Sequence, residues 1–232
     1  CRCLLEDESA LLKHECAYCL GQIQDTHAIP VLNRVLANTD EHPMVRHEAA
    51  EALGAIGAHQ SLDVLKKYLS DGNKSVSETC LLAIQRIEYL LNKTKDLITD
   101  GSSVPFKSVD PVPPLRCDES DISKLDRYRD RFPEFTLLSR EFRHEVAYVL
   151  GQMQNPSTVT QLAANLADFD ENEMVRHECA EALGAIATND AQQELNKYIK
   201  DSQRVVRESV EVALDMSDYN NSEEFQYANA LK

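Results

Sequence analysis

Apolar side chains recur along this chain at intervals of three and four residues, which is the spacing of one face of an α-helix. The first such run covers residues 10–23, with apolar side chains at Leu11, Leu12, Cys16, Cys19, Leu20 and Ile23. The same spacing predicts further helices over residues 26–37, 44–57, 61–69 and 76–91. Thr26 is a candidate N-cap for the second helix, and Pro43 stands where the third can begin. No useful stretch alternates apolar and polar residues, so the pattern predicts an all-α chain.

The second half of the chain repeats the first at an offset of 130 residues. MVRHEAAEALGAI at residues 44–56 returns as MVRHECAEALGAI at 174–186, with twelve of thirteen positions identical. Residues 13–22 return in the same way at 143–152. Helices are therefore expected over residues 139–153, 157–167, 173–187, 190–200 and 203–216. Helices of this length, joined by short turns at a period near 33 residues, are typical of a helical-repeat solenoid.

Prolines divide the chain into two parts. Four of the eight prolines lie close together among glycine and serine, at Pro105, Pro111, Pro113 and Pro114. We therefore predict an N-terminal half over residues 1–92, an extended linker over 93–120 and a C-terminal half over 121–232. The segment from Asp218 to the end is acidic and polar, and we expect it to form a cap or a loose end.

The charge balance limits the kinds of partner. With 24 basic and 39 acidic residues, the formal net charge is −15. This argues against nucleic acid, which needs a basic footprint, and suits either an acidic surface that aids solubility or a basic partner. No apolar run is long enough to cross a bilayer, and no secretory signal is recognisable. We expect a monomer in the cytoplasm, with no membrane contact.

The cysteines invite a disulfide or redox interpretation, because Cys16 and Cys19 have C-x-x-C spacing. The duplication argues against both, because cysteines in one half align with small apolar residues in the other: Cys16 with Val146, Cys19 with Val149, Cys80 with Val210 and Cys179 with Ala49. Free cysteine packs as a small apolar side chain. We therefore predict that these cysteines are reduced core residues, as in a cytosolic protein.

Four histidine–glutamate dipeptides occupy matched positions of the predicted helices: His14-Glu15, His47-Glu48, His144-Glu145 and His177-Glu178. Within each half the two dipeptides lie 33 residues apart. The third inner helix of each half has Glu78 or Glu208 in place of the histidine, so the helix itself does not require the pair. These four dipeptides could bind a ligand together, or they could be a polar helix face that was copied by duplication. The other histidines, His27, His42 and His59, have no copies and are predicted to lie at the surface.

The repeat spacing places equivalent residues of neighbouring helices side by side, about 10 Å apart. Each half then offers two imidazoles and two carboxylates, and the linker allows the halves to face each other about a pseudo-twofold axis. Nitrogen and oxygen ligands with open positions suit non-haem iron, and two such ions form a dinuclear centre held by both halves. Each half alone is expected to hold iron weakly.

Zinc hydrolase chemistry is the competing interpretation, but its H-E-x-x-H spacing is missing. The residues four positions after the histidines are Tyr18, Glu51, Tyr148 and Glu181. Glu51 and Glu181 share a helix face with His47 and His177. Two roles stay open for these carboxylates: hydrogen bonding to the histidines behind a metal, or solvation at the surface.

The segments LLKHECAYCLGQ at 11–22, FRHEVAYVLGQ at 142–152 and the twin MVRHE segments resemble the deoxyhypusine hydroxylase family. The stretch from Val205 to Ser209, and Phe225 to Ala228, resemble it too, so the likeness covers nearly all of the chain outside the linker. The family usually has a further helical repeat before each half's first His-Glu helix. Residues 1–9 are too few to hold one, and residues 121–138 have room for part of one.

This resemblance implies a HEAT-repeat dyad around a non-haem di-iron centre. It implies two Fe(II) ions per chain and O2 as co-substrate, and hydroxylation of the deoxyhypusine side chain of translation initiation factor 5A. All eight residues of the dipeptides are candidate metal ligands; the resemblance places Glu48 and Glu178 on iron with the four histidines, and Glu15 and Glu145 on the substrate side. The alternatives are a non-catalytic HEAT-repeat adaptor and a phycobilin-lyase-like HEAT protein.

Overall fold

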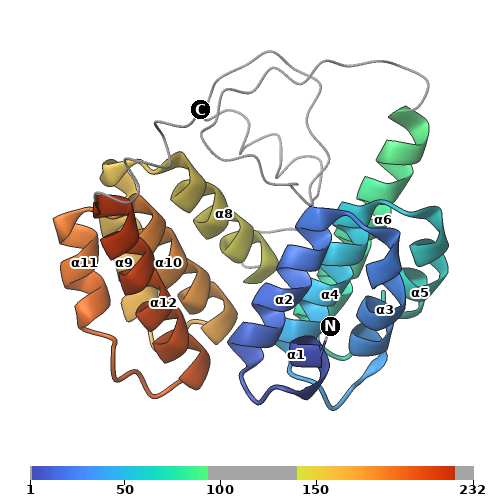
Figure 1. Ribbon diagram of the computed structural model, residues 1–232, viewed down its shortest axis with the longest axis horizontal. Helices are drawn as coiled ribbons and strands as arrows, with labels where there is room; N and C mark the ends of the chain where they lie inside the picture. The colour runs from blue at the N-terminus through green and yellow to red at the C-terminus, as the bar shows by residue number, and fades with distance from the viewer. Residues whose placement is uncertain (1, 94–139, 223–232) are drawn as a thin grey trace. The chain divides into compact units, whose positions relative to one another are not determined.

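The computed structural model describes residues 2–93 and 140–222, which belong to two compact units, one from each half of the chain. All regular elements of these residues are α-helices or short 3-10 helices, so the all-α prediction is confirmed (Figure 1). The predicted linker beyond Lys93 and the tail after Ser222 lie outside the described residues. The two predicted boundaries between the halves and the linker, and the facing arrangement of the halves, stay predictions.

The first unit has two layers of helices (Figure 1). Its inner helices pack in chain order: α2 (Ala10–Ile23), α4 (Pro43–Ile56) and α6 (Lys74–Lys93). The outer helix α3 (Ile29–Ala37) packs on α4, and α5 (Leu62–Lys67) packs on α6. Leucines and alanines buried between the layers form one core. A short helix, α1 (Arg2–Glu6), packs against α2 and was not predicted.

The second unit repeats this plan. Its inner helices are α8 (Arg140–Met153), α10 (Glu173–Ile186) and α12 (Arg204–Asn221), and its outer helices are α9 (Val159–Ala167) and α11 (Asn189–Asn196). Inner helices again pack on inner neighbours, and each outer helix packs on the inner helix that follows it. All ten predicted helices are present. The main differences are that α12 continues to Asn221 and that α11 ends at Asn196.

Short 3-10 turns introduce three of the outer segments: Thr26–Ala28, His59–Ser61 and Pro156–Thr158. The predicted N-cap at Thr26 was wrong by one residue. The Asp25 carboxylate accepts the backbone N–H of His27, and Thr26 is already inside the turn. Pro43 begins α4 as predicted, and Nδ1 of His42 accepts the backbone N–H of Met44 at 3.3 Å.

Glycine allows the inner helices to approach each other closely. A Cβ atom built on Gly21 of α2 would lie 2.9 Å from the Cα of Ala52 in α4. A Cβ on Gly151 of α8 would lie 2.8 Å from the Cα of Ala182 in α10. Real Cβ atoms do not come this near, so any larger residue would separate the two helices that carry the first and second histidines of each unit.

The described cysteines are all free thiols. Cys80 and Cys179 are buried as predicted and Cys16 is half-buried, but the predicted core position of Cys19 was wrong, because its side chain is exposed. Within the described residues, α2 packs on a single inner helix, α4. The exposed Cys19 therefore lies on a part of α2 that no second inner helix of these residues covers. Partial burial and the nearby carboxylate of Glu15 raise the pKa of both Cys16 and Cys19, which keeps the thiols protonated and weakly nucleophilic. No helix in the described part of the chain is long and apolar enough to cross a membrane.

Candidate metal centre

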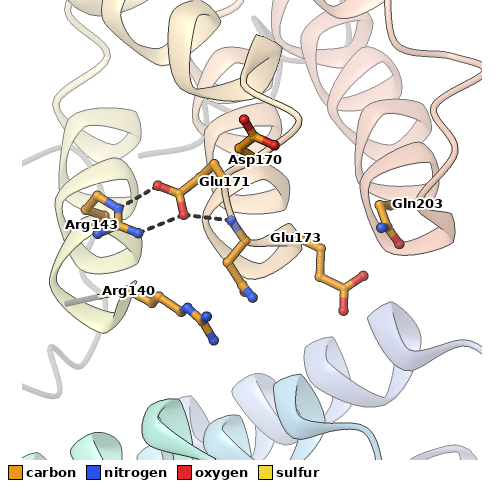
Figure 2. A pocket seen from close by; sticks show the side chains of 7 residues that line it. Arg140, Arg143, Asp170, Glu171, Glu173 and Gln203 are labelled. Carbon is orange, nitrogen blue, oxygen red and sulfur yellow. Dashed lines mark hydrogen bonds and ion pairs between the residues drawn. The ribbon is translucent and has the colours of Figure 1, made fainter. Parts of the chain in front are cut away.

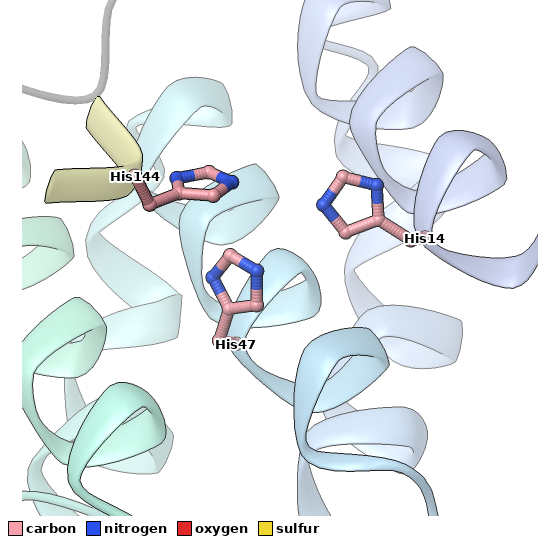
Figure 3. A group of neighbouring side chains, drawn as sticks. All are labelled: His14, His47 and His144. Atoms are coloured by element: carbon pink, nitrogen blue, oxygen red, sulfur yellow. The ribbon is translucent and has the colours of Figure 1, made fainter. Parts of the chain in front are cut away.

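The first unit brings its two histidines together. His14 on α2 and His47 on α4 have ring centroids 5.5 Å apart, with the ring planes tilted by 37° (Figure 3). Both are buried, with 4% and 0% of their surface exposed. The 33-residue step predicted side-by-side histidines, and the close packing of α2 on α4 makes them neighbours.

His14 lies between two carboxylates. Glu48, next to His47 on α4, places Oε2 3.1 Å from Nε2 of His14, and Glu15 places Oε1 2.9 Å from Nδ1 of the same ring. The Glu48 side chain is 3% exposed and the Glu15 side chain 37%. Burial alone would lower the pKa of His14, but the carboxylates of Glu48 and Glu15 together raise that pKa well above its ordinary value.

The second unit reproduces this geometry. His144 on α8 and His177 on α10 have ring centroids 5.5 Å apart. Glu178 Oε2 lies 3.4 Å from His144 Nε2, and Glu145 Oε1 lies 3.4 Å from His144 Nδ1. One ligand atom each from His144, His177 and Glu178 lie within 4.8 Å of one another, and all three residues are buried. Two imidazoles and a carboxylate therefore converge within this unit.

The glutamates one helical turn after the second histidines also lie at this site. Glu181 Oε1 is 3.4 Å from Nδ1 of His177. In the first unit, ligand atoms of His47, Glu48 and Glu51 lie within 4.8 Å of one another. For Glu181, the geometry favours hydrogen bonding to the histidine over simple solvation at the surface.

All eight predicted residues thus lie in two matched clusters, four in each unit. Glu48 and Glu178 each reach the histidine of the neighbouring helix, whereas Glu15 and Glu145 contact the histidine of their own helix. Imidazole nitrogens and carboxylate oxygens in a buried cluster form a donor set for a divalent transition metal such as iron, zinc or manganese. His27 and His59 are exposed as predicted, but His42 is half-buried because it caps α4.

An open cleft of about 580 Å³ lies in the second unit, and its lining includes Arg143, the residue before His144 in the chain (Figure 2). Its lining is polar and charged: Arg140, Arg143, Asp170, Glu171, Asn172, Glu173 and Gln203. Sequence reasoning missed the basic residue that precedes each histidine of the two clusters, although its recurrence as Lys13, Arg46, Arg143 and Arg176 was visible.

Three comparisons with known proteins agree on the repeat fold, and two of them identify the family. A family model for HEAT repeats matches residues 1–85 and 136–215. Deoxyhypusine hydroxylase of Drosophila melanogaster is 49% identical over 97% of this chain and 82% of its own length, and that of Xenopus laevis is 50% identical with the same coverage. The solved structure of human deoxyhypusine hydroxylase in complex with glycerol aligns with a TM-score of 0.82 at 48% identity, covering 93% of this chain and 82% of that one. The chain therefore belongs to the deoxyhypusine hydroxylase family of HEAT-repeat oxidoreductases.

Proposed function

We propose that this chain hydroxylates the deoxyhypusine side chain of translation initiation factor 5A, with O2 as co-substrate, at a non-haem di-iron centre. The observation that carries this proposal is that each unit of a chain from this family buries two neighbouring histidines with a buried glutamate beside the first of them. The duplicated cluster makes a non-catalytic adaptor a poorer account, since an adaptor has no use for buried metal-binding groups.

We assign one ion to His14, His47 and Glu48 and the other to His144, His177 and Glu178. Two imidazoles with one carboxylate are the donor set of non-haem iron oxygenases, and they leave coordination positions open. The chemistry that iron supplies when bound there is the activation of O2. Whether ligands are also shared between the halves stays a prediction.

Glu15 and Glu145 are assigned to the substrate. Their side chains are 37% and 14% exposed, against 3% and 8% for Glu48 and Glu178, so they are the carboxylates that an entering side chain can reach. Deoxyhypusine carries amines, and an ammonium group that enters a partly buried site needs a carboxylate to offset its desolvation. Each of these glutamates also lies beside Nδ1 of its own histidine, so the substrate amine would be held close to the metal ligands.

The acidic chain also suits a basic partner. The formal charge of −15 creates a field that attracts positively charged surfaces during encounter. We extend the proposal to a monomeric enzyme in the cytoplasm, where its protein substrate would meet it.

The test uses the full chain loaded with Fe(II), factor 5A that carries deoxyhypusine, and an added chemical reductant, because the second oxygen atom of O2 must be reduced to water with two electrons and two protons. Intact-mass measurement should show one added oxygen atom, supplied by labelled O2 and absent without O2. The double variant His47→Ala, His177→Ala is the matched inactive protein. Binding of factor 5A without conversion would instead indicate an adaptor, and tight binding of a bilin pigment would indicate the phycobilin-lyase-like alternative.

A further inference from the structure

Each of the four metal-site histidines directly follows a basic residue that is paired with a carboxylate farther along the chain. The pairs are Lys13–Glu41 at 2.8 Å, and Arg46–Asp71, Arg143–Glu171 and Arg176–Asp201 at 2.6 Å each. The partners are separated by 28, 25, 28 and 25 residues in chain order, so the pattern is the same in both units. We call these four contacts the anchor pairs.

Every acidic partner lies in the turn that leads into the next inner helix. The Glu171 carboxylate accepts the backbone N–H of Asn172 at 2.6 Å while it holds Arg143 through both oxygens (Figure 2). Glu41 accepts the N–H of His42 in the same way. Asp71 and Asp201 each accept a backbone N–H two residues on, at Asn73 and Gln203. Each anchor pair therefore attaches a histidine-bearing helix to the start of its inner neighbour.

The second anchor pair of each unit has a further attachment. Nε of Arg46 donates to the carbonyl of Leu36 at 3.1 Å, and Nε of Arg176 donates to the carbonyl of Leu166 at 2.9 Å. These carbonyls lie near the ends of outer helices α3 and α9. The guanidinium groups are bidentate on Asp71 and Asp201; the Arg176–Asp201 pair is buried, and the Arg46 and Asp71 side chains are 5% and 9% exposed. Each arginine therefore fixes its helix to two other elements at once.

Adjacent residues on an α-helix diverge by about 100° around its axis. A basic side chain fixed in the neighbouring turn therefore sets the direction in which the next residue, the histidine, points. Side-chain ends lie about 5–6 Å from the helix axis, so a rotation of about 10° would move a ring nitrogen by about 1 Å. Functional sites tolerate displacements of about 0.5 Å, so helix rotation is the motion that most directly endangers metal binding.

We propose that the anchor pairs Lys13–Glu41, Arg46–Asp71, Arg143–Glu171 and Arg176–Asp201 are positioning devices that fix the rotation of the histidine-bearing helices and so set the geometry of the metal-binding side chains. Metal binding by these histidines is taken from the proposed function. The third inner helix has Ser77 at this position in the first unit and Arg207 in the second, with no histidine after either. Arg207 donates to the backbone carbonyl of Asp201, which lies in the turn before its own helix, so it does not attach α12 to a following helix in this way.

The two units differ at one anchor pair in a way that suggests a conservative substitution. The first anchor pair of the second unit uses an arginine with two bonds to Glu171, whereas its counterpart in the first unit uses Lys13 with a single bond to Glu41. Arg143→Lys therefore recreates a contact that already serves the first unit and should keep the parental metal affinity. Arg176→Lys cannot reproduce the two bonds to Asp201 together with the bond to the Leu166 carbonyl, because these come from three separate nitrogens of the planar guanidinium and the lysine side chain has a single Nζ at one point.

The experiment titrates the metal-free full chain with Co(II), whose visible spectrum reports ligand geometry, in the parent, Arg176→Lys, Asp201→Asn and Arg143→Lys. Arg176→Lys and Asp201→Asn should each lower the affinity for one of the two Co(II) ions by about tenfold or more, as is found for residues that orient metal ligands. A stability control is Leu195→Ala or Leu195→Val, whichever matches the fall in Tm. Leu195 is buried on outer helix α11 and belongs to no anchor pair.

A second measurement does not depend on metal. The nitrogen resonances of the histidine rings, recorded by NMR on metal-free protein, should shift for His177 in Arg176→Lys and stay in place in the Leu195 control. If the parent binds no Co(II) or iron, the proposed function fails, and these resonances still decide the anchor proposal. If both Arg176→Lys and Asp201→Asn keep the parental Co(II) affinity and the parental ring signals, the anchor proposal is wrong. It is also wrong if the Leu195 control loses as much Co(II) affinity as these two variants.

Discussion

Glutamate occupies two different environments at the candidate metal centre. Glu48 and Glu178 are almost fully buried against the histidine of the neighbouring helix, whereas Glu15 and Glu145 contact their own histidine and keep part of their surface exposed. The sequence placed all eight residues on matched helices, but it could not tell which carboxylate meets which ring. That depends on how far one helix is shifted along the other.

The two environments predict different effects of the same substitution. Glu48→Gln and Glu178→Gln should each lose iron, because the amide removes a charged ligand. Glu15→Gln and Glu145→Gln should keep both irons and lose most of the affinity for the deoxyhypusine-bearing substrate. Iron analysis and substrate titration on the four variants check this. Loss of iron from Glu15→Gln, with binding of a metal-independent substrate mimic intact, would contradict the assignment.

The anchor carboxylates predict a pH effect on stability. Hydrogen bonds from Arg46 hold the pKa of Asp71 below its ordinary value, and at Asp201 the bonds from Arg176 outweigh the effect of burial, which alone would raise the pKa. In the unfolded chain both groups titrate near 3.9. A lowered pKa in the folded state means that the stabilisation is complete above about pH 4 and is lost as the pH falls through the folded-state value.

Asp71→Asn should therefore lower the free energy of unfolding by a larger amount at neutral pH than below about pH 4. Urea denaturation of parent and variant at a series of pH values measures the difference. Asp63→Asn, at an exposed position on α5, is the matched control and should change little. A difference between parent and Asp71→Asn that does not vary with pH would show that the ion pair does not stabilise the unit.

At the scale of the helices, close approach of α2 and α4 makes the first cluster possible. By helix propensity alone, Gly21→Ala should stabilise α2 by about 1 kcal/mol. The added Cβ would, however, lie 2.9 Å from the backbone of Ala52, and overpacking of this kind costs about 1–3 kcal/mol. We predict a net loss of stability and weaker iron binding by the first unit. Gly72→Ala, where a Cβ meets nothing within 4 Å, should change neither.

Most of the helices were predictable because each has an apolar face that repeats in both halves. The 3-10 turns and α1 were not predicted, since segments of three to five residues are too short to show a helical period. The anchor pairs could not be predicted from the sequence for a different reason. Their partners stand 25 or 28 residues apart, and only the packing of one repeat on the next brings them together.

At the scale of the whole molecule, the excess of acidic residues predicts salt-sensitive recognition. Association of the chain with factor 5A should weaken as ionic strength rises, because salt screens charges over a Debye length of about 8 Å at physiological strength. The affinity should fall between about 0.05 and 0.5 M salt, as measured by calorimetry or by fluorescence titration. An affinity that does not change over this range would count against attraction by the acidic surface.

The central claim is that each unit supplies two histidines and one glutamate to one iron. Iron content per chain, measured after loading the full chain with Fe(II) and removing free metal, tests it most directly. We predict two irons in the parent and one, held more weakly, in His47→Ala and in His177→Ala. The double variant should hold none. A parent without iron, one tightly bound zinc in each half, or two irons retained in the double variant would contradict the account.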